Sequence, residues 1–324
     1  MRVFVTGGTG AVGRYAVDAL VSAGHTVTAL SRTPLKADQL RAQGADPIEV
    51  SLFDTDALAR AFVGHEAVVN LASALPATSR FAFPSAWREN DRVRIDGSRA
   101  VVDAAIAAGV GIVVQESVSM IYRDNGTEWI DENTPTDRFP MAAPNHAAEE
   151  SAARFSAAGG CGVVLRFGWF YGPGASHSEE FFSLARRHIC VSMGRPDTYV
   201  SSIHVADAGH AVEAALRVSS GTYNVVDDEP LTKRSYADAL AAAAGVRCRL
   251  RLPGSAALLL GDRTTSLTRS LRVSNSRFRS ATDWVPQFPN AREGWRSISS
   301  SPQKGRRSPT SRKYASASAG SRRL

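Results

Sequence analysis

The sequence predicts an α/β protein with a doubly wound parallel sheet and a smaller, mostly helical lobe toward the C-terminus. Its 324 residues suffice for about two units of ~150 residues each. Before Arg166, short runs rich in Val and Ile alternate with amphipathic segments of roughly 10–15 residues, and beyond it helical spacing predominates. Strands joined through helices have right-handed crossovers, so the sheet is parallel and carries helices on both faces.

The elements follow in chain order from this alternation. Short apolar runs that end in polar or glycine residues predict strands at Arg2–Thr6, Thr26–Leu30, Pro47–Val50, Ala67–Leu71, Ile112–Gln115, Gly162–Arg166 and Thr222–Val226. Apolar residues at helical spacing predict helices at Val12–Ala23, Lys36–Ala42, Asp56–Phe62, Asn90–Ala108, Ala147–Ala157, Val205–Leu216, Tyr236–Ala243, Ser255–Leu260, Ser274–Ala281 and Ala291–Ile298.

The last segment, residues 297–324, differs in composition from the rest of the chain. It holds seven of the 38 Lys and Arg residues and no acid, so residues 1–296 carry 31 basic and 31 acidic side chains. A basic groove for nucleic acid therefore has no support in the net charge of residues 1–296. We expect the tail to be disordered, because it has little apolar surface to bury. There are two alternatives to disorder. The tail can bind nucleic acid or a membrane surface, or its sequence can result from a shifted reading frame.

Cysteine and histidine usage excludes other classes of protein. Cys161, Cys190 and Cys248 form no Cys-x-x-Cys motif, and their odd number argues against a disulfide framework. No zinc-type spacing is present, so no metal site is expected. The N-terminus lacks the apolar stretch of a signal peptide, and no apolar run is long enough to span a bilayer. We therefore expect a cytoplasmic protein.

The clearest motif is Thr-Gly-Gly-Thr-Gly-Ala-Val-Gly at residues 6–13, between the first strand and the first helix. In such a turn Gly7 permits the sharp bend, Gly10 lets the backbone approach a pyrophosphate, and Gly13 lets helix and strand pack closely. The free amides of the helix N-terminus then bind the phosphates. The motif therefore predicts a dinucleotide site in a Rossmann-type sheet.

The glycine motif and further collinear segments together resemble the short-chain dehydrogenase/reductase superfamily, and within it the NAD-dependent epimerase/dehydratase family. These segments are residues 67–73, 102–110, 165–174, 202–208 and 223–225. The resemblance covers roughly residues 1–296. It implies an NAD(P)-binding domain at 1–170 and a substrate lobe at 171–296 that returns a strand and a helix to the sheet.

The resemblance also implies which residues contact the cofactor. They lie in the glycine turn, after the second strand and after the fourth strand: Gly7, Thr9, Gly10, Ala11, Val12, Gly13, Ser31, Arg32, Leu71, Ala72 and Ser73. NAD is held through its ribose 2′-hydroxyl by a carboxylate at the end of the second strand. Here Ser31 and Arg32 stand in that place, and Arg14 can add a second charge. Ser31 and Arg32 both suit a 2′-phosphate, so NADP is favoured over NAD.

The proton-transfer residues of the family are missing. The resemblance implies a Tyr-x-x-x-Lys pair and a Ser or Thr, whose positions hold Met141, Asn145 and Val118. None of these side chains can titrate. The substitute proton donors expected from the sequence lie nearby: Tyr122, His146, Tyr171 and, if a bulge presents either, Ser117 or Ser119. His204 matches a position that is usually structural.

Two functions follow from this combination. The first is an NAD(P)-dependent oxidoreductase or epimerase/dehydratase that acts on a carbonyl or hydroxyl of a small molecule or nucleotide sugar. The alternative is a catalytically weakened dinucleotide-binding sensor or regulatory protein, since a fold does not imply its chemistry. The expected partner is a small-molecule substrate; no nucleic acid is expected for residues 1–296 and no membrane, and a homodimer is left open.

Overall fold

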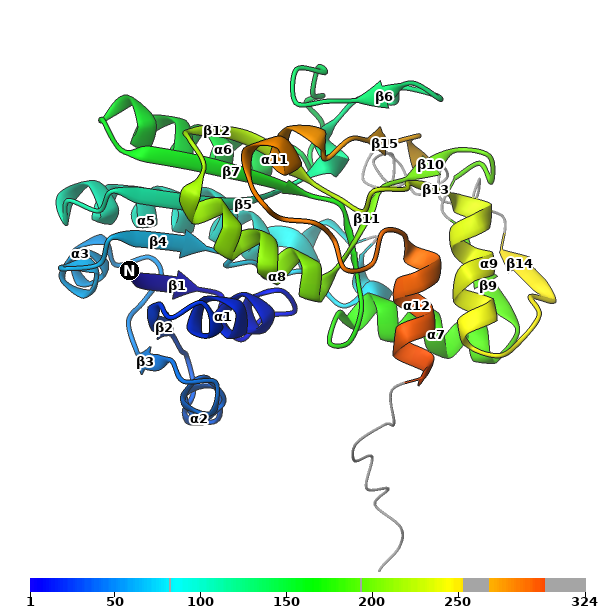
Figure 1. Cartoon of the computed structure of the whole chain (residues 1–324), viewed down its shortest axis with the longest axis horizontal. Coiled ribbons are helices and arrows are strands. Elements are labelled where there is room, and N and C mark those ends of the chain that lie inside the picture. Colours follow the sequence, from blue (N-terminus) through cyan, green and yellow to red (C-terminus); the bar gives the residue numbers. More distant parts are fainter. Residues whose placement is uncertain (82, 193, 253–267, 301–324) are drawn as a thin grey trace, which may run out of the picture.

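The computed structural model describes residues 1–81, 83–192, 194–252 and 268–300. Its centre is a seven-stranded parallel sheet in the order β12-β7-β5-β4-β1-β2-β3 (Figure 1). The strands are β1 (Arg2–Thr6), β2 (Thr26–Leu30), β3 (Asp46–Ile48), β4 (Ala67–Asn70), β5 (Ile112–Val118), β7 (Cys161–Phe167) and β12 (Gly221–Val225). The predicted α/β class and doubly wound parallel sheet are confirmed.

Helices cover both faces of this sheet. One face carries α1 (Gly13–Ser22) and α8 (Val205–Ala214), and the other carries α3 (Thr55–Phe62), α5 (Ser98–Ala107) and α6 (Ala143–Ala157) (Figure 1). The helix α2 (Pro34–Ala42) contacts β3. Alternation along β1 accounts for the two cores, because Val3 and Val5 pack in the cluster with α1 and α8 while Phe4 packs with α3 and α5.

The predicted helix at residues 90–108 is not continuous. It consists of α4 (Arg88–Arg92), a π-helical turn η3 (Val93–Gly97) and α5. Single π turns inside helices occur often at functional sites, because the inserted residue re-aims its neighbours. Short 3₁₀ turns lie at η1 (Thr78–Arg80), η2 (Pro84–Trp87), η4 (Ser119–Ile121) and η5 (Ala215–Arg217).

Most of the remaining elements gather beyond the carboxyl ends of β5 and β7, whereas α11 (Ser276–Ala281) packs against β12 at the edge of the sheet (Figure 1). The other helices are α7 (Ser176–Arg186), α9 (Lys233–Ala243) and α12 (Ala291–Ser300). The strands pair as β8 (Trp169–Tyr171) with β11 (Ser202–His204), β9 (Ile189–Val191) with β14 (Leu250–Leu252), β10 (Tyr199–Val200) with β13 (Leu231–Thr232), and β6 (Trp129–Ile130) with β15 (Arg272–Val273).

Two sequence-based expectations meet the ends of the described chain. The predicted helix at 255–260 lies outside the described residues. The tail was expected to be disordered from residue 297, but α12 continues to Ser300. Its anchor is Trp295, which packs against Tyr171 and Phe182, so the helix extends one turn into the serine-rich segment. The rest of the tail lies outside the described residues.

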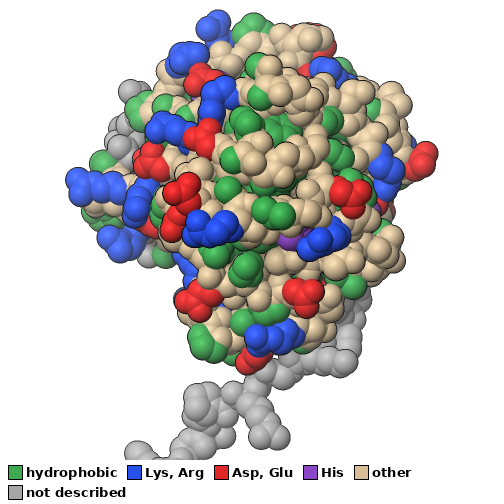
Figure 2. All heavy atoms as spheres, turned by 90° about the vertical axis from the view of Figure 1, so that its left-hand side faces the viewer, with side chains coloured by type: hydrophobic (Ala, Val, Ile, Leu, Met, Phe, Trp, Pro, Cys, Tyr) green, Lys and Arg blue, Asp and Glu red, His purple; other side chains and the backbone are tan. Residues whose placement is uncertain are grey.

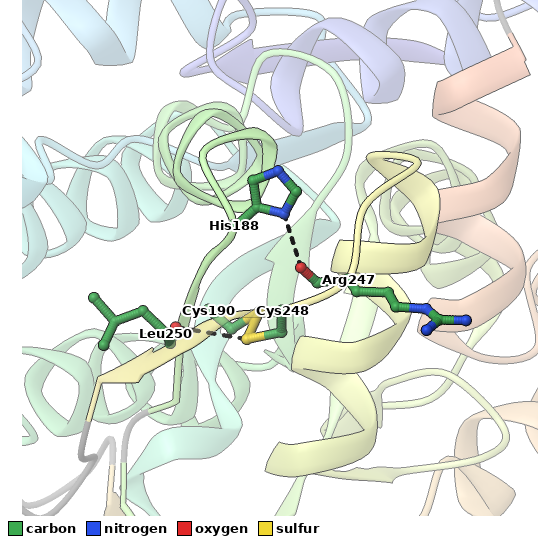
Figure 3. The surroundings of a disulfide bond; sticks show 5 residues. All are labelled: His188, Cys190, Arg247, Cys248 and Leu250. Atoms are coloured by element: carbon green, nitrogen blue, oxygen red, sulfur yellow. Dashed lines mark hydrogen bonds between the residues drawn. A yellow bond between two sulfur atoms is a disulfide. The ribbon is translucent and has the colours of Figure 1, made fainter.

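The odd cysteine count does not exclude a disulfide bond. Cys190 of β9 and Cys248, just before β14, form one with their Cα atoms 5.8 Å apart (Figure 3). They are 58 residues apart in sequence and meet because β9 and β14 pair side by side. The neighbouring ring of His188 bonds to the carbonyl of Arg247 at 2.9 Å. Cys161 is the free cysteine.

The face shown in Figure 2 carries charges of both signs, and the described part of the chain holds neither a helix that could cross a bilayer nor a cluster of metal-ligating side chains. Basic and acidic side chains are interspersed over the face shown in Figure 2, as the balanced charge of residues 1–296 predicts. No described helix is both long and apolar enough to cross a bilayer. Within the same residues, no group of three or more His, Cys, Asp or Glu side chains could hold a metal ion.

Candidate functional site

The glycine turn between β1 and α1 is packed tightly against the end of β4. Gly7 has φ of 72°, and its carbonyl accepts a 2.9 Å hydrogen bond from the amide of Gly10. A Cβ atom at Gly7 would overlap the carbonyl of Leu71, and one at Gly13 would overlap the carbonyl of Gly7. The turn therefore requires glycine at both positions. Without side chains at these glycines, a ligand can approach the backbone amides where α1 begins.

A cavity at the carboxyl ends of β1, β2 and β4, here the nucleotide cavity, opens beside this turn. Five of the predicted cofactor residues line it: Gly7, Thr9, Arg32, Ala72 and Ser73. The other six, Gly10, Ala11, Val12, Gly13, Ser31 and Leu71, lie beside them in the chain. Ligands of open α/β sheets bind in this position, outside the carboxyl ends of the strands.

Two cations meet in the nucleotide cavity, and the sequence analysis found one of them. Arg32 lines the cavity together with Lys36, in the first turn of α2. The spacing of four residues was the available signal, since Thr33 caps α2 and turns the chain between them. Arg14 does not line this cavity, and its Nη2 donates to the carbonyl of Pro173 at 2.6 Å.

A second cavity, the reaction cavity, holds the three positions at which the chain departs from the family. Val118, Met141 and Asn145 all line it. Its other walls are mostly apolar or aromatic, among them Leu75, Phe81, Trp87, Ile121, Phe139, Trp169 and Phe170. Asn145 Nδ2 donates to the carbonyl of Met141 at 3.0 Å, whereas its buried Oδ1 has no hydrogen-bond partner within the described residues.

The predicted donor Tyr122 lies in a buried network rather than in the wall of this cavity. Its hydroxyl donates to Asn224 Oδ1 and accepts from Arg166 Nη1, each at 2.9 Å. Burial raises the pKa of Tyr122, although Arg166 counteracts the effect. The side chain is fully buried, so a substrate in the cavity does not reach its hydroxyl.

Strand pleating explains where Ser117 lies. β5 pairs with β7 residue by residue from Ile112 to Val118, without a bulge. Side chains two apart therefore share one side of the strand, and Ser117 lies opposite to Glu116 and Val118. Its hydroxyl donates to Glu149 Oε1 at 2.6 Å, and Arg166 binds both oxygens of that carboxylate.

The other predicted donors are dispersed. Ser119 lies in η4 and lines a neighbouring cavity. The His146 ring bonds to the carbonyl of Asp137 at 3.0 Å. Tyr171 is fully buried, with its hydroxyl 3.4 Å from the carbonyl of Asn290. His204 caps α8 by accepting from the amide of Ala206, in a structural position.

The reaction cavity also contains a buried ion pair that the sequence analysis missed. Arg94 Nη2 of η3 donates to Glu116 Oε1 at 2.8 Å, and both side chains are more than nine-tenths buried. Burial raises the pKa of Glu116, and the guanidinium of Arg94 lowers it by a smaller amount. An acid within the strand predicted at residues 112–115 or directly after it was the available signal, because buried carboxyls are rare.

The neighbouring cavity, here the lobe cavity, shares Met120 and Trp169 with the reaction cavity. Its walls are largely aromatic or aliphatic: Phe181, Val191, Tyr199, Val200, Tyr236, Leu240 and Leu271. Its two cations bind the protein itself. Arg269 donates to the carbonyl of Tyr122 and to Asp137 Oδ2, and Lys233 Nζ donates to the carbonyl of Arg269 at 2.9 Å.

Comparison with known proteins agrees with this geometry. Residues 3–225 match the NAD dependent epimerase/dehydratase family. The chain belongs to this family. Its members include NAD(P)-dependent oxidoreductases, epimerases and dehydratases, so the predicted class of enzyme and the predicted NAD(P) cofactor are confirmed.

Three proteins illustrate the similarity. The 3-diazoavenalumate denitrifying reductase of a Streptomyces species is 32% identical, with 91% of this chain and 99% of the relative covered. The 4-hydroxy-2-methyl-3-oxo-4-farnesyl-3,4-dihydroquinoline-1-oxide ketoreductase of Stigmatella aurantiaca is 28% identical over 84% of this chain and 82% of its own. The structure of the human epimerase family protein SDR39U1 with NADPH superposes with a TM-score of 0.76 at 23% identity, covering 92% and 99% of the two chains.

Proposed function

We propose that the protein is an NADPH-dependent reductase of a carbonyl group on an apolar or aromatic small molecule. The observation that carries this proposal is the junction of two aromatic-walled cavities at Met120 and Trp169. A nucleotide sugar brings a diphosphate, which needs cations with free donors. Lys233 and Arg269 instead donate to backbone carbonyls and to Asp137. Two of the relatives reported above are reductases by name, and one of them is a ketoreductase of a farnesyl dihydroquinoline oxide.

The nucleotide cavity fits NADPH. The bare backbone at the start of α1 suits the pyrophosphate, and Arg32 with Lys36 suits a 2′-phosphate. In the reaction cavity, Asn145 is the polar side chain at the position where the family lysine would contact the ribose. When bound, the cofactor supplies the hydride chemistry, and the protein supplies orientation and a proton.

Steady-state oxidation of NADPH tests the proposal. Purified protein is offered a panel of aromatic and long-chain aliphatic ketones, with UDP-glucose as the nucleotide-sugar comparison. We expect consumption of NADPH with members of the panel and no turnover of UDP-glucose. Epimerisation or dehydration of UDP-glucose would overturn the substrate class.

A second function has its own supporting observation. Val118, Met141 and Asn145 stand together in the reaction cavity where the family has titratable groups, as in a nucleotide-binding regulator. Fluorescence titration with NADPH separates the two functions. Tight binding without turnover across the whole panel would favour the regulator over the reductase.

A further inference from the structure

The reaction cavity offers few groups that can deliver a proton. Its titratable side chains are Arg94, Glu116 and His177. An arginine keeps its proton in proteins. The Nε2 of His177 lies 2.6 Å from the carbonyl of Phe170, so it carries the hydrogen and donates it there. Burial lowers the pKa of His177, which leaves a neutral ring whose other nitrogen can only accept.

Glu116 is placed where a proton donor is needed. It precedes Val118, the position of the family hydroxyl, by two residues on a regular strand, so both side chains lie on the same side of β5 about 7 Å apart along it. Both line the reaction cavity. Oε1 of Glu116 accepts from Arg94, while Oε2 has no hydrogen-bond partner within the described residues and is not sealed in the interior.

We infer that Glu116, held by Arg94, is the proton donor that replaces the missing tyrosine of the family. This inference rests on the proposed reductase function. The O–H bond of the Glu116 carboxylic acid breaks as a new O–H bond forms on the carbonyl oxygen of the substrate. That oxygen takes up the π electron pair of the carbonyl as the hydride that NADPH would supply forms the new C–H bond at the carbonyl carbon, with NADP⁺ as the oxidised product. The charge left on the carboxylate is neutralised by Arg94, and water at the cavity mouth returns the proton.

The environment of the pair supports this role. Burial makes the charged form of Glu116 costly and raises its pKa, which favours the acid more than at an exposed glutamate. Arg94 limits that shift and keeps the carboxylate accessible as the product of proton transfer. The kcat of the reduction should therefore fall as the pH rises through the pKa of Glu116, because the acid is the active form.

The first test compares the same change in two buried Arg–Glu pairs. Glu116→Gln should lower kcat by about 10²–10⁴-fold and abolish the fall at high pH, with NADPH affinity unchanged. Glu149→Gln alters the pair with Arg166, outside the reaction cavity, and should lose stability while keeping kcat within about threefold. Arg94→Gln should move the fall to higher pH, since Arg94 lowers the pKa. A Glu116→Gln variant with kcat within about threefold of the wild type would overturn the inference.

The second test needs neither cofactor nor substrate. Infrared spectra of the protein labelled with ¹³C-glutamate are recorded against pH for the wild type and for Glu116→Gln. We expect a protonated carboxyl signal that titrates above the ordinary glutamate range, about 4.3, and is missing from the variant. A titration at or below that range would overturn the inference even if no substrate is found. If Glu116→Gln does not fold, Glu116→Asp serves, and the labelled signal should be missing from it as well, because an aspartate carries no ¹³C-glutamate label.

Discussion

The nucleotide cavity and the reaction cavity lie at the carboxyl ends of the same sheet, but they are built from different parts of the chain. The glycine turn between β1 and α1, whose shape depends on close backbone contacts, forms one side of the first. Side chains from η3, β5 and α6 form the second. The backbone site keeps the family pattern, whereas the side-chain site has lost the residues of its pattern at Val118, Met141 and Asn145. The glycine turn that suits the cofactor is therefore retained, whereas proton transfer would have to use other side chains than the family's.

The largest effect on cofactor binding is expected from a side chain added to the glycine turn. Gly7→Ala should weaken NADPH binding on the order of 100-fold, because the new Cβ overlaps the carbonyl of Leu71 and displaces the turn. Gly24→Ala is the matched control, since Gly24 also has a positive φ but open space at its Cβ. It should cost about 1 kcal/mol of stability and leave binding intact. Fluorescence titration with NADPH measures the affinity of both variants. Equal affinities would contradict this account of the turn.

An intermediate effect should come from the cations of the nucleotide cavity. Arg32→Asp should shift the preference from NADPH toward NADH at least tenfold, because a charge-assisted contact of ~1.5–3 kcal/mol is replaced by repulsion. Arg41→Asp changes the net charge equally on the exposed side of α2 and should leave the ratio unchanged. Dissociation constants of both nucleotides give the ratio. Identical ratios in Arg32→Asp and the wild type would remove Arg32 from the site.

The smallest effect on turnover is expected outside both cavities. Tyr122→Phe removes the hydroxyl that bonds Arg166 Nη1 and Asn224 Oδ1, so it should lower the free energy of unfolding by about 1–3 kcal/mol while kcat stays within about threefold. Tyr171→Phe removes another fully buried hydroxyl and serves as the matched variant, which should also lose stability while kcat stays within about threefold. Denaturant unfolding and kcat are measured together. A tenfold fall in kcat with folding intact would return the donor role to Tyr122 and would contradict that role for Glu116.

The sequence by itself determined the parts of this protein that depend on neighbouring residues. The bounds of β1 and β2 were predicted correctly because β-branched runs ending in glycine or polar residues are local signals. The glycine turn was recognised for the same reason, since strand, glycines and helix lie within residues 2–22. Family membership followed from these segments in their order along the chain.

Only the tertiary structure decided which side chains meet in the cavities. The register of β5 turns Ser117 toward Glu149 and Glu116 toward Arg94, 22 residues earlier, where the π turn of η3 has shifted the helix. Cys190 and Cys248 meet because β9 and β14 pair across 58 residues. A pattern in sequence records the alternation of faces within one element, but contacts between elements depend on register and packing, which a single sequence does not record.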